Sequence, residues 1–114
     1  MRQLFTTRIE EIAIGSADLR DGLERCAWLM EDEDAAGNAW CEAEGYDGYT
    51  SYASLDDLPE RFPEFAELKR HLDKAAAAFA KAHYWDMEGL SLTLDAIWVN
   101  ILGEGGHHSG HIHP

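Results

Sequence analysis

The stretch from Ala96 to Leu102 is apolar at every position except Asn100, and it constrains the fold more than any other feature. Side chains alternate between the two faces of a strand, so a continuous apolar run predicts a central strand covered on both faces. Leu90, Leu92 and Leu94 alternate with polar residues, which extends the strand pattern toward the N-terminus. One long strand cannot form a sheet core alone, and we therefore expect the chain to stop before its sheet is complete.

Two helices are predicted before this strand. Ser16 is a candidate N-cap, and the apolar spacing that follows predicts a helix from about Ala17 to Glu31, ending in an acidic run that frays. Pro63 suits the first position of a second helix, whose apolar face continues to His83. We interpret His83 as a packed residue at the helix end and not as a ligand.

Two other segments have weaker patterns. The residues from Phe5 to Ile9 are rich in β-formers and predict a short strand. The region from Trp40 to Leu58 interleaves tyrosines with turn-forming residues and predicts a loop. Its aromatic side chains either pack on the core or form a recognition lid.

The charge balance limits the classes of partner. The chain has 9 Lys and Arg against 22 Asp and Glu, a net charge of -13, which disfavours nucleic acid and anionic membranes. No apolar run approaches the roughly 20 residues that span a bilayer. Cys26 and Cys41 form no CxxC pair and are expected to be reduced thiols. We expect a cytoplasmic protein with a single domain over residues 1–114.

Histidines are concentrated at the C-terminus. Four of the six lie in the last eight residues: His107, His108, His111 and His113. In a strand, His111 and His113 would point to the same face, so their imidazoles would be aimed at one point. Neutral imidazole binds Fe, Zn, Ni and Cu, and the pattern alone does not select among these metals. A His-rich tail that binds no metal is the alternative.

The combination of Trp98-Val99-Asn100-Ile101 with His111-Ile112-His113-Pro114 resembles a family of uncharacterised bacterial proteins that are regarded as 2-oxoglutarate-Fe(II) oxygenases. The segments 4–7 and 49–55 are also similar to that family, so the resemblance spans most of the chain. It implies an α+β fold in which helices pack outside a double-stranded β-helix, or jelly roll. This chain would supply the N-terminal helical portion and the first strands, truncated before the jelly roll closes.

The resemblance also implies a site. Fe(II) would be held by His111 and His113, and Asn100 would orient a ligand or the small-molecule co-substrate 2-oxoglutarate. The third ligand and an arginine that pairs with the co-substrate would lie downstream of Pro114. The usual facial triad has two histidines and one carboxylate, and here His113 stands where an acid is common. The implied activity is hydroxylation of an unidentified substrate, and a homodimer is left open.

Two interpretations compete with the oxygenase. One is a non-catalytic acidic module that binds a divalent metal through its His-rich C-terminus. The other is a protein-interaction module whose helices form an acidic docking surface. Only the oxygenase predicts dependence on 2-oxoglutarate, and only the interaction module predicts that replacing His111 and His113 changes nothing.

Overall fold

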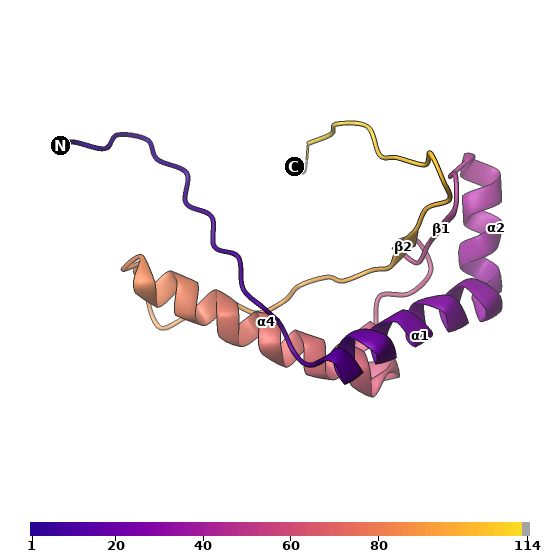
Figure 1. The fold of residues 1–114 in the computed structure, drawn as a ribbon, viewed down its shortest axis with the longest axis horizontal. Coiled ribbons are helices and arrows are strands. Elements are labelled where there is room, and N and C mark those ends of the chain that lie inside the picture. Colours follow the sequence, from indigo (N-terminus) through magenta and orange to yellow (C-terminus); the bar gives the residue numbers. More distant parts are fainter. Residues whose placement is uncertain (113–114) are drawn as a thin grey trace.

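The structure of the protein, a computed structural model, describes residues 1–112. The elements in order are α1 (Ala17–Glu33), α2 (Ala35–Glu44), β1 (Tyr49–Thr50), α3 (Leu58–Arg61), α4 (Pro63–Ala82) and β2 (Asn100–Ile101). Helices α1 and α4 pack on each other, and α2 rises from the end of α1 beside the strands (Figure 1). The α+β class is therefore confirmed. Within residues 1–112 the sheet is a two-stranded antiparallel pair, and the jelly roll stays a prediction.

Asp34 joins α1 to α2 and belongs to the end of one helix and the start of the other. Its N–H donates to the carbonyl of Met30 at 2.8 Å, and its carboxylate accepts from the N–H of Gly37 at 3.0 Å. The first bond closes α1 and the second opens α2. Helix α1 ends within the predicted acidic run, two residues later than expected, at Glu33, and Asp34 then caps the next helix. Fraying of this end stays a prediction.

Helix α2 corrects the prediction of a loop from Trp40 onward. The loop begins only after Glu44, where Gly45 ends the helix with a φ of 67°. Gly37 lies inside α2 although glycine is a poor helix former. A Cβ at Gly37 would overlap the carboxylate of Asp34 and come close to the hydroxyl of Ser54, so the packing around the helix start requires glycine there.

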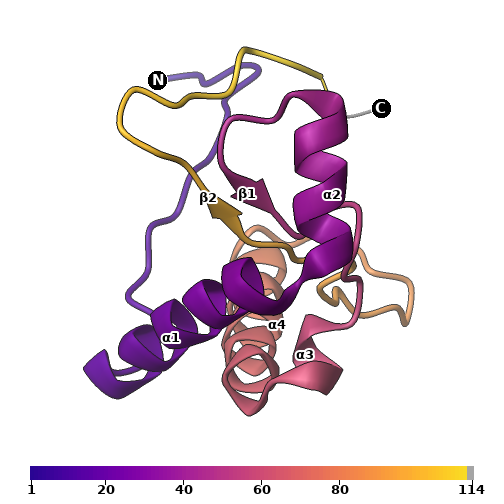
Figure 2. The ribbon, with the colours of Figure 1, turned by 90° about the vertical axis from the view of Figure 1, so that its right-hand side faces the viewer.

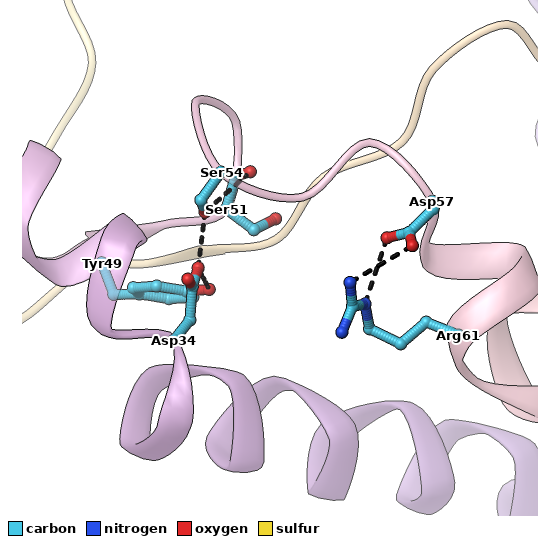
Figure 3. Close-up of polar contacts among 6 residues, drawn as sticks. All are labelled: Asp34, Tyr49, Ser51, Ser54, Asp57 and Arg61. Carbon is cyan, nitrogen blue, oxygen red and sulfur yellow. Dashed lines mark hydrogen bonds and ion pairs between the residues drawn. The ribbon is translucent and has the colours of Figure 1, made fainter.

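The carboxylate of Asp34 also holds β1 in place (Figure 3). It accepts hydrogen bonds from the Tyr49 hydroxyl at 2.7 Å and from the Ser54 hydroxyl at 2.5 Å. Tyr49 and Ser51 are fully buried, and Ser51 pairs with the backbone of Val99 in both directions, at 3.0 and 2.9 Å. These bonds fix β1 to the helices on one side and to the chain before β2 on the other.

The core lies where α1, α2, β1, α3 and α4 meet. Its buried residues are Cys26, Met30, Cys41, Tyr49, Leu58 and Phe65. Both cysteines are unpaired and buried, in agreement with the expected reduced thiols. Burial, together with a hydrogen bond from the thiol to Glu64, raises the pKa of Cys26 to about 11, so this thiol is protonated at neutral pH.

The second long helix begins and ends as predicted. Pro63 is its first residue, and His83 caps it, with the imidazole Nδ1 at 2.7 Å from the carbonyl of Phe79. The His83 ring packs on the Phe79 ring with centroids 4.1 Å apart. The interpretation of His83 as a packed end residue is confirmed.

The region of the predicted central strand is covered on one face only. Ile97, Val99 and Ile101 are half-buried against the core, whereas Trp98 and Asn100 between them are exposed. The prediction of a strand covered on both faces is therefore wrong for the part of the chain that the structure describes. The physical reason is that only β1 lies beside β2, and the helices lie on one side of the pair.

The N-terminal segment has no strand at Phe5–Ile9, and that prediction is wrong too. Residues 1–13 are exposed and form an extended segment, which lines one open pocket with the end of α4 (Figure 1). A strand needs a partner strand for its backbone groups, and within residues 1–112 no strand pairs with this segment. Accordingly the radius of gyration is 17.2 Å, against about 13 Å for a compact domain of this length.

The hydrogen bonds at Asp34 predict a dependence of stability on pH. Burial raises the pKa of the Asp34 carboxyl, but the bonds from Ser54, Tyr49 and Gly37, with the charge of Arg61, outweigh it, and the pKa lies below its ordinary 3.8. A carboxyl with a depressed pKa stabilises the fold above the unfolded-state value and loses this effect as pH falls. The stability advantage of the wild type over Asp34→Asn should be constant above about pH 5 and should shrink below about pH 4.

Urea unfolding of both proteins between pH 3 and pH 7 checks this expectation. The comparison with Asp34→Asn cancels the titration of the other carboxylates, which the two proteins share. An advantage that stays the same down to pH 3 would show that the charge of Asp34 does not contribute.

Candidate functional site

An open groove lies on the uncovered side of β2. Its volume is ≈ 930 Å³, and four aromatic rings line it: Trp40 from α2, Tyr46 from the turn after α2, Tyr52 from the turn after β1, and Trp98 from the chain before β2. We call it the aromatic groove. The chain after β2 turns back past the end of α2 and brings the histidine-rich segment to the same place (Figure 2).

The rings are arranged as two neighbouring pairs. Tyr52 and Trp98 meet edge to face with centroids 5.1 Å apart and planes at 71°. Trp40 and Tyr46 are tilted at 6.5 Å. Trp40 and Tyr46 are half-buried, whereas Tyr52 is 63% exposed and Trp98 is 38% exposed. The pair of Trp40 and Tyr46 is thus supported by the protein, and the pair of Tyr52 and Trp98 is open to a ligand.

Asn100 lies beside the rings and its amide is oriented by the protein. The hydroxyl of Thr50 donates to Oδ1 of Asn100 at 2.7 Å, and Thr50 is itself buried. The register that pairs Thr50 with Asn100 across the two strands produces this contact. Asn100 lines the groove, and its Nδ2 group is a hydrogen-bond donor.

Two imidazoles complete the lining. Nε2 of His108 is 2.6 Å from the Tyr46 hydroxyl, and the His108 ring stands edge-on to the Tyr46 ring at 5.4 Å. His111 is exposed, and its Nδ1 lies 2.9 Å from the carbonyl of Ser109.

The residues predicted from the sequence are brought together in part. Asn100 and His111 line the same groove, although they are eleven positions apart in the sequence. His113, the second predicted metal ligand, lies outside the described residues. Within residues 1–112 no three His, Cys, Asp or Glu side chains are grouped closely enough to hold a metal ion. Among the described residues the groove lining contains no lysine or arginine, and the arginine that the resemblance implies for 2-oxoglutarate stays a prediction for sequence after Pro114.

Sequence reasoning missed Tyr46, Tyr52 and Asp95 as groove residues. Tyr46 and Tyr52 belong to the segment for which packing and a recognition lid were both considered. The structure divides it: Tyr49 packs in the core and Tyr52 lies exposed in the groove. The turn-forming residues near Tyr52 were the one sequence signal that could have indicated an exposed ring there. Asp95 gave none, because a single acid in a strand pattern is ordinary.

Comparison with known proteins gives no family for this chain. No family model matches the sequence, and no curated protein matches it either. In the described part of the chain, no helix combines the length and the apolar character needed to cross a membrane. The functional argument therefore depends on the aromatic groove and the histidines beside it.

Proposed function

We propose that this chain forms part of a non-haem Fe(II), 2-oxoglutarate-dependent oxygenase, in which His111 and His113 are metal ligands beside the aromatic groove. One observation carries the proposal. Trp98, Asn100 and His111, three residues of the sequence pattern that resembles such oxygenases, line one groove. A histidine-rich tail that binds no metal would not be expected to place His111 in one groove with Trp98 and Asn100.

The groove contains imidazoles, which suit Fe(II), but too few grouped ligands for an iron site among residues 1–112. Imidazole is a normal ligand of Fe(II), and the facial triad requires two histidines and a carboxylate. Among residues 1–112, His108 and His111 are the imidazoles of the groove, and His108 is engaged by Tyr46. The lining also contains the carboxylate of Asp95, but no three such donors among residues 1–112 are grouped closely enough to hold a metal ion. Further donors must therefore come from outside these residues, and His113 is the next histidine along the chain.

When bound, iron and 2-oxoglutarate would supply the oxidising chemistry that hydroxylates a C–H bond. The residues of this chain have the tasks of binding and orientation. The Nδ2 group of Asn100, held in place by Thr50, is a donor suited to a carboxylate of the co-substrate. The rings of Trp40 and Tyr46 would exclude water from one side of the site.

Replacing His111 and His113 together with alanine is expected to weaken Fe(II) binding by more than about 100-fold, because both proposed imidazole ligands are removed. Anaerobic titration with Fe(II) measures the affinity. His71→Ala is the matched control, since it removes a partly exposed imidazole of α4 that lies 3.6 Å from Glu67 and does not line the groove.

The outcomes separate the three functions. Iron binding that survives both replacements would exclude the proposed site and leave an interaction module. Iron binding that is lost, in a protein that consumes no 2-oxoglutarate, would favour a metal-binding module. Loss of both iron binding and 2-oxoglutarate consumption in the variant, with both present in the wild type, is the result expected for the oxygenase.

A further inference from the structure

The rings of Tyr52 and Trp98 in the aromatic groove are exposed, at 63% and 38%. Tyr52 and Trp98 come from different segments, yet they meet edge to face without a covering layer among residues 1–112. Large exposed apolar surfaces that lie together in a concave site commonly mark a binding site. The faces of aromatic rings also carry partial negative charge and attract cations.

The side chain of Asp95, which lines the groove with these rings, is also negatively charged. Asp95 is exposed, lines the groove, and makes no hydrogen bond or ion pair with any other residue that the structure describes. No lysine or arginine of the lining balances its charge. The chain as a whole has a net charge of -13, so its field also favours a positive partner.

We infer that the aromatic groove binds a cationic side chain of a polypeptide, of the lysine or arginine type, between the rings of Tyr52 and Trp98 and the carboxylate of Asp95. The alkyl part of such a side chain packs on the rings while its charged end reaches the carboxylate. The volume of ≈ 930 Å³ accommodates the side chain with its flanking backbone. This inference names a substrate class for the proposed oxygenase, but it depends on the groove and not on iron.

The test compares two peptides that differ in one charge. Capped Gly-Gly-Lys-Gly-Gly is titrated into the ¹⁵N-labelled protein in the presence of EDTA, and the same peptide with norleucine in place of lysine is titrated in parallel. The lysine peptide is expected to shift the indole N–H resonance of Trp98. The norleucine peptide keeps most of the alkyl chain without the ammonium group and is expected to bind at least about fivefold more weakly.

Two variants locate the site. Asp95→Asn and Trp98→Leu should each weaken binding of the lysine peptide by about fivefold. Asp21→Asn is the matched control, because it makes the same change of net charge at an exposed position of α1 and should leave the affinity unchanged. Both groove residues are exposed, and the remaining amide resonances report whether each variant is folded.

Equal binding of the two peptides, or full affinity in Asp95→Asn, would overturn the inference. The same holds if Asp21→Asn weakens binding as much as Asp95→Asn does, since the effect would then come from net charge alone. Because no metal is present in this titration, its failure leaves the iron site untouched. Conversely, loss of the proposed iron site leaves the peptide result standing.

Discussion

Replacing Asp34 with alanine is expected to lower the free energy of unfolding by about 3 kcal/mol, from the loss of a helix cap and of hydrogen bonds to a charged group. The cap bond to the N–H of Gly37 would be lost at the start of α2. The hydroxyl of Tyr49, whose side chain is only 1% exposed, would lose its acceptor inside the core. Ser54 would lose its acceptor as well. Urea unfolding followed by circular dichroism measures the change.

Asp34→Asn provides the control for this effect. Asparagine is a good N-cap and keeps one side-chain oxygen for the N–H of Gly37, but its NH2 group cannot accept from Tyr49 and Ser54 as Oδ2 does. The expected cost is therefore smaller than that of Asp34→Ala, about 2 kcal/mol. In the double variant with Tyr49→Phe, the effect of Asp34→Ala should be smaller, because the hydroxyl that needs the acceptor is gone. A loss below about 0.5 kcal/mol for Asp34→Ala would mean that water replaces the carboxylate at no cost.

Gly48→Ala is expected to cost about 3 kcal/mol, because backbone strain and a steric clash are combined at one position. Gly48 has a φ of 123°, a value that residues with a side chain rarely adopt. A Cβ at this position would overlap the carbonyl oxygen of Ile101, the partner of Tyr49 in the β1–β2 pair. The substitution should therefore separate the two strands and displace Asn100 from the groove.

Gly45→Ala is the matched control for the clash. Gly45 also has a positive φ, 67°, but a Cβ there meets nothing within 4 Å. Only the left-handed backbone is penalised, at about 1 kcal/mol. Urea unfolding gives both values, and the amide resonance of Ile101 reports whether the strands stay paired. Similar losses for the two variants would show that backbone strain alone, and not the contact with β2, determines the cost.

The helices could be predicted wherever their signals are local. Ser16 accepts the N–H of Leu19 as an N-cap does, and Pro63 begins α4, so capping chemistry and apolar spacing placed both starts correctly. Helix α2 was missed because its start is determined by Asp34, which the sequence presents as one acid in a run of four. The role of that carboxylate depends on Tyr49 and Ser54, which lie 15 and 20 residues away.

In the candidate site too, local sequence signals were predictive and long-range contacts were not. The residue types at positions 100 and 111 and the resemblance of their pattern were enough to predict that they belong to one site. The details of the site depend on long-range contacts. Asn100 accepts a hydrogen bond from Thr50, which is 50 positions away in the sequence, and Tyr46 contacts His108, which is 62 positions away. The aromatic groove itself was not predicted, since a ring exposed in a groove and a ring buried in a core look alike in sequence.

The sequence by itself determined the local features of this protein: where α1 and α4 begin, that the cysteines are unpaired, and that an excess of acid covers the surface. These depend on neighbouring residues and on composition. Only the tertiary structure decided that Asp34 links two helices to β1, and that one face of β2 is covered by the core while the other lines a groove. Burial and pairing depend on which distant segments meet, and an apolar side chain has the same hydrophobic tendency whether or not the fold supplies a surface to cover it.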